Sequence, residues 1–281
     1  MYKIVRKKEL GNKIYSIEIY APDIAKNAKA GQFVIFRVDE KGERVPVTIA
    51  GTNIKEGLVK IIFQEAGKST VRLASFSEGD FIKDFAGPLG NPTVIKLYGT
   101  VAAVAGGVGA AELLPVIKEL KAAGNKIVTI LGARCKDMLI LKDELEEESD
   151  TLLFATNDGS CGTKGFVTDV LKKLIDTQAV NVVYAIGPVP MMRAVSDLTK
   201  EKRIKTIVSL NPIMLDGTGM CGACRVTING KIKFACVDGP EFDAHSVEWD
   251  ELASRLSSFK DLEKISFNNF TANRGCECHR K

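Results

Sequence analysis

The stretch that decides the fold is VAAVAGGVGAAELLP, residues 101–115. Its first five residues are a continuous apolar run, which predicts a buried β-strand, and a helix is predicted over residues 110–123. Gly106, Gly107 and Gly109 lie between the two. Where a strand runs directly into a helix, glycines let a phosphate approach the N–H groups at the helix start. The run is not G-x-G-x-x-G, so it indicates a nucleotide-binding turn without the standard fingerprint.

Strands and helices alternate through the residues that follow this stretch. The alternation predicts a parallel sheet with helices on both faces, in an α/β domain that we expect to span residues 99–207. Further strands are expected over residues 126–131, 151–155 and 181–186, and further helices over residues 137–147 and 165–176.

Two more glycine-rich turns follow strands of the same predicted sheet. One contains Asp158 within the sequence NDGSCG, and the other begins with Gly187 and Pro188. Ligands of an open parallel sheet bind beyond the carboxyl ends of its strands, so all three turns belong to one binding edge. Met191 and Met192 follow the last turn, and they suit a binding site and a core equally well.

Residues 1–98, before the sheet, are predicted to form short β-strands. Runs with period-two alternation, such as KIYSIEIY from Lys13, are separated by turn signals at Lys41-Gly42 and Glu56-Gly57. Several short strands at this spacing predict a small antiparallel β-barrel. The strands are expected over residues 1–6, 13–20, 32–38 and 58–63, with one short helix over residues 70–76.

Two segments of the predicted barrel suit a phosphorylated cofactor. In RVPVT, Arg44 offers a planar, permanently charged fork to a pyrophosphate, and Thr48 is a hydroxyl donor two residues beyond Pro46. In GKST, residues 67–70, a glycine opens a helix beside two hydroxyls, which is an anion site. An edge-strand proline beside a surface arginine also explains the first segment, and a simple helix cap also explains the second.

A cysteine-containing loop, LDGTGMCGAC at residues 215–224, is followed by Cys236. Asp216, Cys221, Cys224 and Cys236 have the spacing Asp-x4-Cys-x2-Cys-x11-Cys. A plant-type [2Fe–2S] site has the spacing C-x4-C-x2-C with a distant fourth cysteine. The loop matches at three positions and has an aspartate in place of the first thiolate, and its glycines let it fold tightly around a cluster. We therefore expect a [2Fe–2S] cluster at these four residues.

Other interpretations of these cysteines stay open. A structural zinc site would use cysteine and histidine ligands, and His245 is the histidine nearest in the sequence. The thiols could also be buried and inert, and Asp216 could cap the loop while another residue or water completes the site. A disulfide framework is disfavoured, because seven cysteines is an odd number and no signal peptide precedes them.

Composition argues against several classes of function. Lys and Arg total 39 and Asp and Glu total 35, and this net charge of +4 is too small and dispersed to indicate nucleic acid binding. The apolar run over residues 101–108 is interrupted by glycines and too short to span a membrane. The N-terminus has no apolar signal-peptide core, so we expect a cytoplasmic chain of two or three domains with no membrane partner.

These motifs, in this order, resemble the ferredoxin–NADP reductase superfamily. The matching motifs are the RVPVT strand, the GGVG turn at residues 106–109 and the GPVPMM turn at residues 187–192. MCGACRV and ACVDGPEFDAHSV are similar to the branch that holds dihydroorotate dehydrogenase electron-transfer subunits and the small subunits of NADH-dependent ferredoxin:NADP⁺ oxidoreductases, also called sulfide dehydrogenases. The resemblance covers residues 1 to about 255.

The resemblance implies a fold of three parts and a residue set for each cofactor. An antiparallel flavin-binding barrel (1–98) would precede the NAD(P)-binding α/β domain (99–207), a small iron–sulfur domain (208–260) and a C-terminal tail (261–281). Thr48 would act on the flavin directly, and Val47 stands where many relatives have an aromatic residue. FAD would be held by Arg44, Pro46, Val47, Thr48, Gly67, Ser69 and Thr70; NAD(H) by Gly106, Gly107, Gly109, Asp158, Gly187 and Pro188; and the cluster by Asp216, Cys221, Cys224 and Cys236.

The implied activity is electron transfer by a flavoprotein subunit. A hydride would pass between NAD(H) and FAD, and single electrons would pass through the [2Fe–2S] cluster. In the resembling family, a larger flavo-iron–sulfur subunit completes a heterodimer that bifurcates electrons and delivers some to ferredoxin. Alternatives are a dihydroorotate or sulfide dehydrogenase subunit and a non-enzymatic iron–sulfur or zinc module. Cys276 and Cys278, in the tail, suit either a metal site or a disordered terminus.

Overall fold

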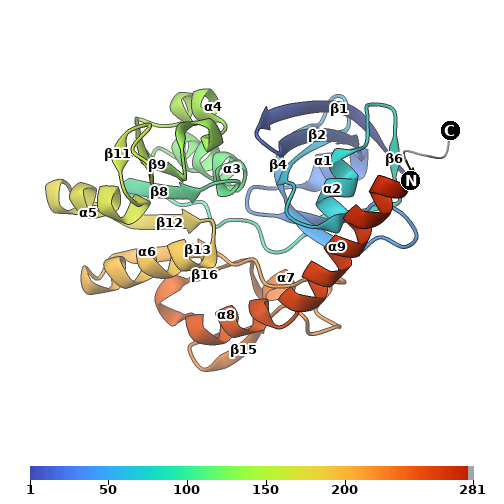
Figure 1. Cartoon of the computed structure of the whole chain (residues 1–281). Coiled ribbons are helices and arrows are strands. Elements are labelled where there is room, and N and C mark those ends of the chain that lie inside the picture. The colour runs from blue at the N-terminus through green and yellow to red at the C-terminus, as the bar shows by residue number, and fades with distance from the viewer. Residues whose placement is uncertain (278–281) are drawn as a thin grey trace.

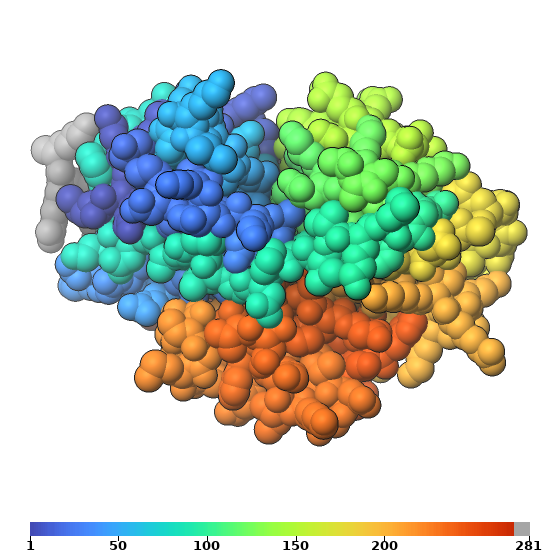
Figure 2. Space-filling model, turned by 180° about the vertical axis from the view of Figure 1, so that it is seen from behind, coloured from blue at the N-terminus to red at the C-terminus, as the bar shows by residue number. Residues whose placement is uncertain are grey.

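The computed structural model describes residues 1–277, with side chains through Ala272. Three lobes follow one another along the chain, and they lie in contact in Figure 1 and, from behind, in Figure 2. The first is an antiparallel barrel, the second is an α/β sheet, and the third lies below both in these views. The fold class predicted from the sequence is confirmed.

The first lobe contains all the predicted strands and the short helix. Its elements are β1 (Tyr2–Gly11), β2 (Ile14–Tyr20), α1 (Pro22–Asn27), β3 (Phe33–Arg37), β4 (Val45–Asn53), β5 (Leu58–Gln64), α2 (Lys68–Ala74), β6 (Phe81–Ile82) and β7 (Asp84–Leu89). The strand order is β6-β1-β2-β5-β4-β3-β7, and every pairing is antiparallel. Alternate side chains of a strand point to opposite faces, so Ile17 and Ile19 of β2 are both buried inside the barrel.

The second lobe follows the predicted alternation of strands and helices. Its elements are β8 (Thr100–Gly106), α3 (Gly109–Ala122), β9 (Lys126–Ala133), the 3₁₀ turn η1 (Lys136–Met138), α4 (Lys142–Glu147), β10 (Thr151–Thr156), β11 (Thr163–Lys164), α5 (Val167–Thr177), β12 (Val182–Ile186), α6 (Val189–Glu201) and β13 (Lys205–Ser209). These strands pair in parallel. The sheet order is β11-β10-β9-β8-β12-β13, and β16 (Glu241–Asp243) of the third lobe adds an antiparallel edge.

One helix of this lobe was predicted wrongly. The sequence predicted a continuous helix over residues 137–147, but the structure has η1, then a break, then α4. Leu139 and Ile140 in the break are buried against the sheet, and Leu141 adopts a left-handed φ of 55°. Burial of these two side chains therefore outweighs the local helix propensity of the segment.

The third lobe is small and surrounds the cysteine-containing loop. Besides β16, its elements are β14 (Arg225–Ile228), β15 (Lys231–Phe234), α7 (Ala235–Asp238), the 3₁₀ turn η2 (Ala244–Ser246), α8 (Trp249–Ser257) and α9 (Lys260–Glu277). The domain limits predicted from the sequence stay predictions, and β13 runs across the one at residue 207.

Helix α9 replaces most of the tail that was predicted over residues 261–281. It runs back from the third lobe and contacts α2 of the barrel (Figure 1). Asp261 and Glu263 lie in its first turn, where acidic side chains stabilise a helix. Cys278 lies outside the described residues, and so does the side chain of Cys276. Within residues 1–277, no helix is long and apolar enough to cross a membrane.

Two hydrophobic clusters join the lobes to one another. Phe33 and Ile35 of the barrel belong to one cluster with Val104 of the sheet and with Cys224 and Cys236 of the third lobe. A second cluster contains Ile14, Ala50 and Ile62 of the barrel together with the buried face of α3. Shared burial of this kind fixes the lobes relative to one another, because sliding them apart would expose apolar surface to water.

Candidate active site and cluster loop

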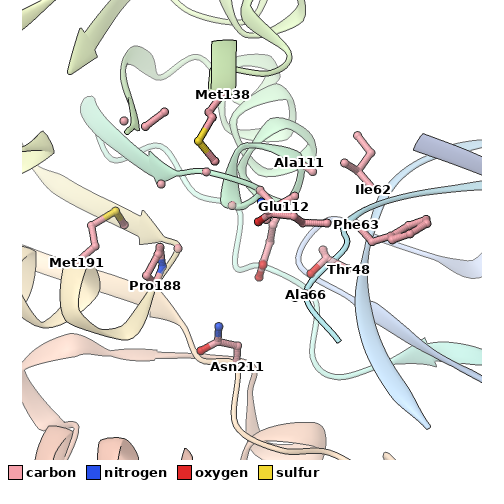
Figure 3. Close-up of a pocket in the computed structure, with 18 of the residues that line it drawn as sticks. Thr48, Ile62, Phe63, Ala66, Ala111, Glu112, Met138, Pro188, Met191 and Asn211 are labelled. Carbon is pink, nitrogen blue, oxygen red and sulfur yellow. The ribbon is translucent and has the colours of Figure 1, made fainter. Parts of the chain in front are cut away.

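A cavity of about 740 Å³ lies where the barrel meets the α/β lobe. Figure 3 shows its walls: β4 and β5 on one side, α3 above, and the β12–α6 turn with Pro188 and Met191 opposite. Residues from all three predicted glycine-rich turns or their flanks line it, as do residues of the predicted flavin strand. The predicted residues that line the cavity are Pro46, Val47, Thr48, Thr70, Gly106, Gly107, Gly109, Gly187 and Pro188.

The barrel wall of the cavity is set by the pairing of β4 with β3. Thr48 is opposite Phe33, and Pro46 is opposite Ile35. Thr48 is half-buried and points from the wall toward Glu112 of α3 (Figure 3). Its hydroxyl therefore lies inside the cavity, within reach of a bound ligand.

Glycines form the opposite wall because side chains would not fit there. A Cβ on Gly109 would lie 2.3 Å from the carbonyl oxygen of Ile186, and one on Gly106 would lie 2.6 Å from the sulfur of Met191. The start of α3 is thus packed against the end of β12, with its N–H groups at the cavity. The next residue, Met192, is fully buried in the core, so Met191 alone of the two lines the cavity.

Four predicted cofactor residues lie beside the cavity and do not line it. Arg44 is exposed just before β4, and Gly67 caps the start of α2. Ser69 is buried and donates its hydroxyl to Glu43 at 2.7 Å. Asp158 is exposed beyond β10, where it accepts hydrogen bonds from the backbone and hydroxyl of Ser160.

The structure adds a carboxyl group that the sequence analysis did not identify. Glu112, in the first turn of α3, lines the cavity, accepts a hydrogen bond from the Ser209 hydroxyl and lies beside the Thr48 hydroxyl. Burial raises the pKa of the Glu112 carboxyl, and the two hydroxyls oppose that shift. The signal in the sequence that could have identified Glu112 was its place between two apolar residues, Ala111 and Leu113, which are buried in the structure.

A second carboxyl lies behind the first. Glu241 of β16 is the cross-strand partner of Ser209 and accepts a hydrogen bond from the hydroxyl of Thr93 at 2.6 Å. Burial is the main cause that raises the pKa of Glu241 to about 7, and the nearby Glu112 carboxylate adds to it. The chain thus places two carboxyls with raised pKa values next to the same hydroxyl-bearing strand end.

The predicted cluster residues lie in the third lobe as two pairs. The sulfur atoms of Cys224 and Cys236 are buried and 3.2 Å apart, which is much longer than a disulfide bond. Asp216 accepts the backbone N–H groups of Thr218 and Cys221, both at 2.9 Å. Within residues 1–277, no three candidate ligand side chains already stand in metal-binding geometry.

The donor set of this loop nevertheless fits an iron–sulfur cluster. Gly217, Gly219 and Gly222 all have positive φ values, which wrap the loop around the cysteines, and Cys221 stays exposed at its outer end. Burial raises the pKa of the Cys236 thiol to about 12, with a further contribution from Cys224. A bound metal would overcome that shift, because ligation deprotonates a thiol outright.

Two protein-family models match the chain at these sites. An oxidoreductase NAD-binding domain matches residues 103–197, which include the glycine turns. The iron–sulfur cluster binding domain of dihydroorotate dehydrogenase B matches residues 211–248, which include Asp216 and the three loop cysteines. The chain is therefore a flavin-dependent oxidoreductase chain of the ferredoxin–NADP reductase type, and FAD, NAD(H) and a [2Fe–2S] cluster are the cofactors of this class.

Comparison with similar proteins identifies the family of this chain within the ferredoxin–NADP reductase type. The dihydroorotate dehydrogenase B (NAD(+)) electron transfer subunit homolog of Thermotoga maritima is 50% identical over 273 residues, covering 97% of this chain and 96% of that protein. The electron transfer subunit of the same enzyme from Desulforamulus reducens is 35% identical, covering 84% of this chain and 93% of that protein. The chain belongs to the family of dihydroorotate dehydrogenase B electron transfer subunits and their homologs.

Solved structures agree with this assignment. A chain from the NADH-dependent reduced ferredoxin–NADP oxidoreductase, whose structure was used to study flavin-based electron bifurcation, is 49% identical with a TM-score of 0.91. The match covers 96% of this chain and 98% of that one. Phthalate dioxygenase reductase, at 18% identity and a TM-score of 0.58 over 81% of this chain and 85% of that one, shares the fold alone.

Gly109→Ala should disrupt the packing of α3 against β12. The added Cβ would meet the Ile186 backbone, which cannot move without shifting the strand, so we expect a loss of about 1–3 kcal/mol in unfolding free energy. NADH binding should weaken as well. Gly51→Ala is the control, because a Cβ there meets nothing within 4 Å. Urea unfolding and NADH titration measure both effects, and equal stability of the two variants would contradict the packing argument.

Glu241→Gln should remove a pH dependence of stability. The unfolded chain ionises Glu241 near 4.5 and the folded chain near 7, so the folded state binds more protons between these values. Folding stability of the natural chain should therefore fall as pH rises through this window, by an amount on the order of 1–3 kcal/mol. The variant should be the more stable protein above about pH 8, with the difference vanishing below about pH 4.5.

Unfolding in urea at several pH values tests this expectation. Glu251→Gln, at an exposed position of α8, is the matched control and should follow the natural chain at every pH. A Glu241→Gln curve that runs parallel to the natural one would show that this carboxyl ionises normally in the folded protein.

Proposed function

We propose that this chain is the electron-transfer flavoprotein subunit of an electron-bifurcating NADH-dependent ferredoxin:NADP⁺ oxidoreductase. In this role a hydride passes between NAD(H) and FAD in the cavity, and single electrons pass through the cluster loop. The main support for this proposal is that the Thr48 wall of the barrel and the glycine wall of α3 enclose one cavity. A flavin on the first wall and a nicotinamide on the second would therefore meet inside it.

Residue roles follow from these walls. Thr48 orients the flavin edge, and the barrel residues around it hold the cofactor, with Arg44 reaching its pyrophosphate from outside the cavity. The glycines at the start of α3 and the Gly187-Pro188 turn border the nicotinamide nucleotide, and Asp158 lies where the rest of the nucleotide would extend. The cofactors supply hydride and electron chemistry, and the protein supplies position and electrostatics.

The overall reaction is supported by two observations. The similar chain from the ferredoxin–NADP oxidoreductase covers nearly the same length, which fits a shared role in electron bifurcation. Asp216 replaces the first thiolate of the usual cluster pattern, and we assign it as the oxygen ligand of the cluster. A larger flavo-iron–sulfur subunit would be the partner, and ferredoxin would exchange electrons with the complex in the cytoplasm.

A second function is favoured by the names of the relatives. Several are electron transfer subunits of dihydroorotate dehydrogenase B, and the family model of the cluster domain is named for the same enzyme. In that case the partner would be the dehydrogenase subunit, and the cavity and the cluster would keep the same roles.

The purified full chain should show flavin absorption bands with a broad iron–sulfur shoulder, and NADH should bleach the flavin bands without oxygen. Co-purification of the natural complex then separates the two functions. A larger flavo-iron–sulfur subunit supports the bifurcating enzyme, and a dihydroorotate-oxidising subunit supports the second function. A colourless protein with stoichiometric zinc would exclude both.

Asp216→Cys should keep a [2Fe–2S] cluster and shift its midpoint potential. A carboxylate is a harder donor than a thiolate, so exchanging them changes the charge distribution at the iron. Redox titration monitored by electron paramagnetic resonance measures the shift, with the exposed Asp261→Asn of α9 as control. An unchanged potential would indicate that Asp216 only caps the loop through the N–H groups of Thr218 and Cys221.

A further inference from the structure

A set of hydroxyl and carboxyl groups extends from the cavity into the junction of the three lobes. It begins at Thr48 on the barrel wall, continues through Glu112 of α3, and reaches Ser209 at the end of β13. Beyond Ser209, its cross-strand neighbour Glu241 bonds Thr93 in the segment that links the first two lobes. The five side chains come from five different parts of the chain, so the arrangement exists only in the folded protein.

Glu112 is the member of this set that faces the cavity. Figure 3 shows its side chain directed from α3 toward Thr48, between the two walls. Its carboxyl accepts the Ser209 hydroxyl and lies beside the Thr48 hydroxyl, and its exposed part faces the cavity. A bound cofactor would cover that opening and remove water from the carboxyl. Removal of water favours the neutral form, so proton uptake by Glu112 becomes easier when the cavity is filled.

The charged neighbour of Glu112 also favours the neutral form of its carboxyl. Glu241 is the acidic neighbour from β16, and its charge also acts on Tyr184 of β12. The groups that face Glu112 from β4 and β13 are the neutral hydroxyls of Thr48 and Ser209. Within residues 1–277, no lysine, arginine or histidine shifts the pKa of either carboxyl. The features that favour the anion are these two hydroxyls and the position of Glu112 at the start of α3.

We propose that Glu112 is the proton-holding residue of this active site, that the Thr48 hydroxyl connects it to the bound flavin, and that Glu241 tunes it from behind. The inference rests on the proposed function only in requiring FAD at the Thr48 wall. It assigns Glu112 a role in the reaction and Glu241 a positioning role that acts through the Ser209 strand end.

The proton step balances with the electron flow of the proposed reaction. Bound FAD and the cluster would supply the redox chemistry, in which loss of two electrons from the reduced flavin also frees the proton of its N–H bond. The Thr48 oxygen accepts the proton as its own hydroxyl proton passes to a Glu112 oxygen. One N–H bond would break on the flavin, one O–H bond would be exchanged on Thr48, and one O–H bond would form on Glu112, which changes from an anion to a neutral acid. The hydride that reduces the flavin again would carry its own hydrogen, so Glu112 would release its proton to solvent when the cavity reopens.

Glu112→Gln tests the proposal, because glutamine keeps the size and the acceptor for Ser209 and cannot take up a proton. In the purified full chain with its FAD and cluster, infrared difference spectra of the oxidised and reduced protein should contain the carbonyl band of a protonated carboxyl. That band should disappear in the variant. Flavin reoxidation should slow by about 100-fold, the lower end of the usual contribution of a positioned acid–base group.

Matched variants separate this role from a structural one. Glu119→Gln lies on the exposed face of the same helix and should keep the band and the rate. Glu241→Gln should keep the infrared band. In this variant the plot of flavin midpoint potential against pH should change its slope at a lower pH, because Glu112 loses a negative neighbour. Ser209→Ala removes a hydrogen bond to Glu112 and should shift that pH upward.

The outcomes distinguish failure of this proposal from failure of the proposed function. A full chain without flavin absorption would refute the function itself. A flavin-containing Glu112→Gln variant with the same infrared band, the same rate and the same pH profile as the natural chain would refute the role of Glu112. Loss of the rate with the band retained would assign Glu112 a structural role and likewise overturn the proposal.

Discussion

The close packing of the start of α3 against the end of β12 is the constraint on which the active site depends. Gly109 lies so near the carbonyl of Ile186 that no side chain fits between them. This approach opens the first turn of α3 toward the barrel, which brings Glu112 to Thr48 and Ser209. A helix set even slightly farther out would separate the hydroxyls from the carboxyl and widen the cavity between the two walls.

Shared hydrophobic clusters turn this local contact into a rigid arrangement of three sites. Phe33, on the strand opposite Thr48, is buried in the same cluster as Cys224 and Cys236. The cavity wall that carries Thr48 and the cluster loop are therefore held in place by one continuous core and not by a flexible linker. For an electron carrier this matters, because the protein contributes mainly by holding cofactors at set positions in a set electrostatic environment.

Local patterns in the sequence predicted the parts of this arrangement that a short segment determines. Glycine turns after strands, alternating barrel strands and the spacing of the cysteines each depend on a few neighbouring residues. The helix over residues 137–147 was wrong because Leu139 and Ile140 are held by the distant sheet, and helix α9 was missed because its sequence is polar on average. Glu112, Ser209 and Glu241 are far apart in the sequence, and nothing local indicates that β16 pairs with β13.

The carboxyl groups at the cluster loop and those at the cavity have pKa values shifted in opposite directions. Backbone N–H groups of Thr218 and Cys221 hold the pKa of Asp216 below its usual value, so this carboxylate stays an anion. At the cavity, burial acts on Glu112 and Glu241 in the other direction, toward the neutral acid. In the proposed roles, electrons would leave through the cluster loop, and protons would be held at the cavity, where negative charge is disfavoured. Placing the two kinds of environment in one rigid body would let the electrons and the proton of the proposed reaction take separate routes.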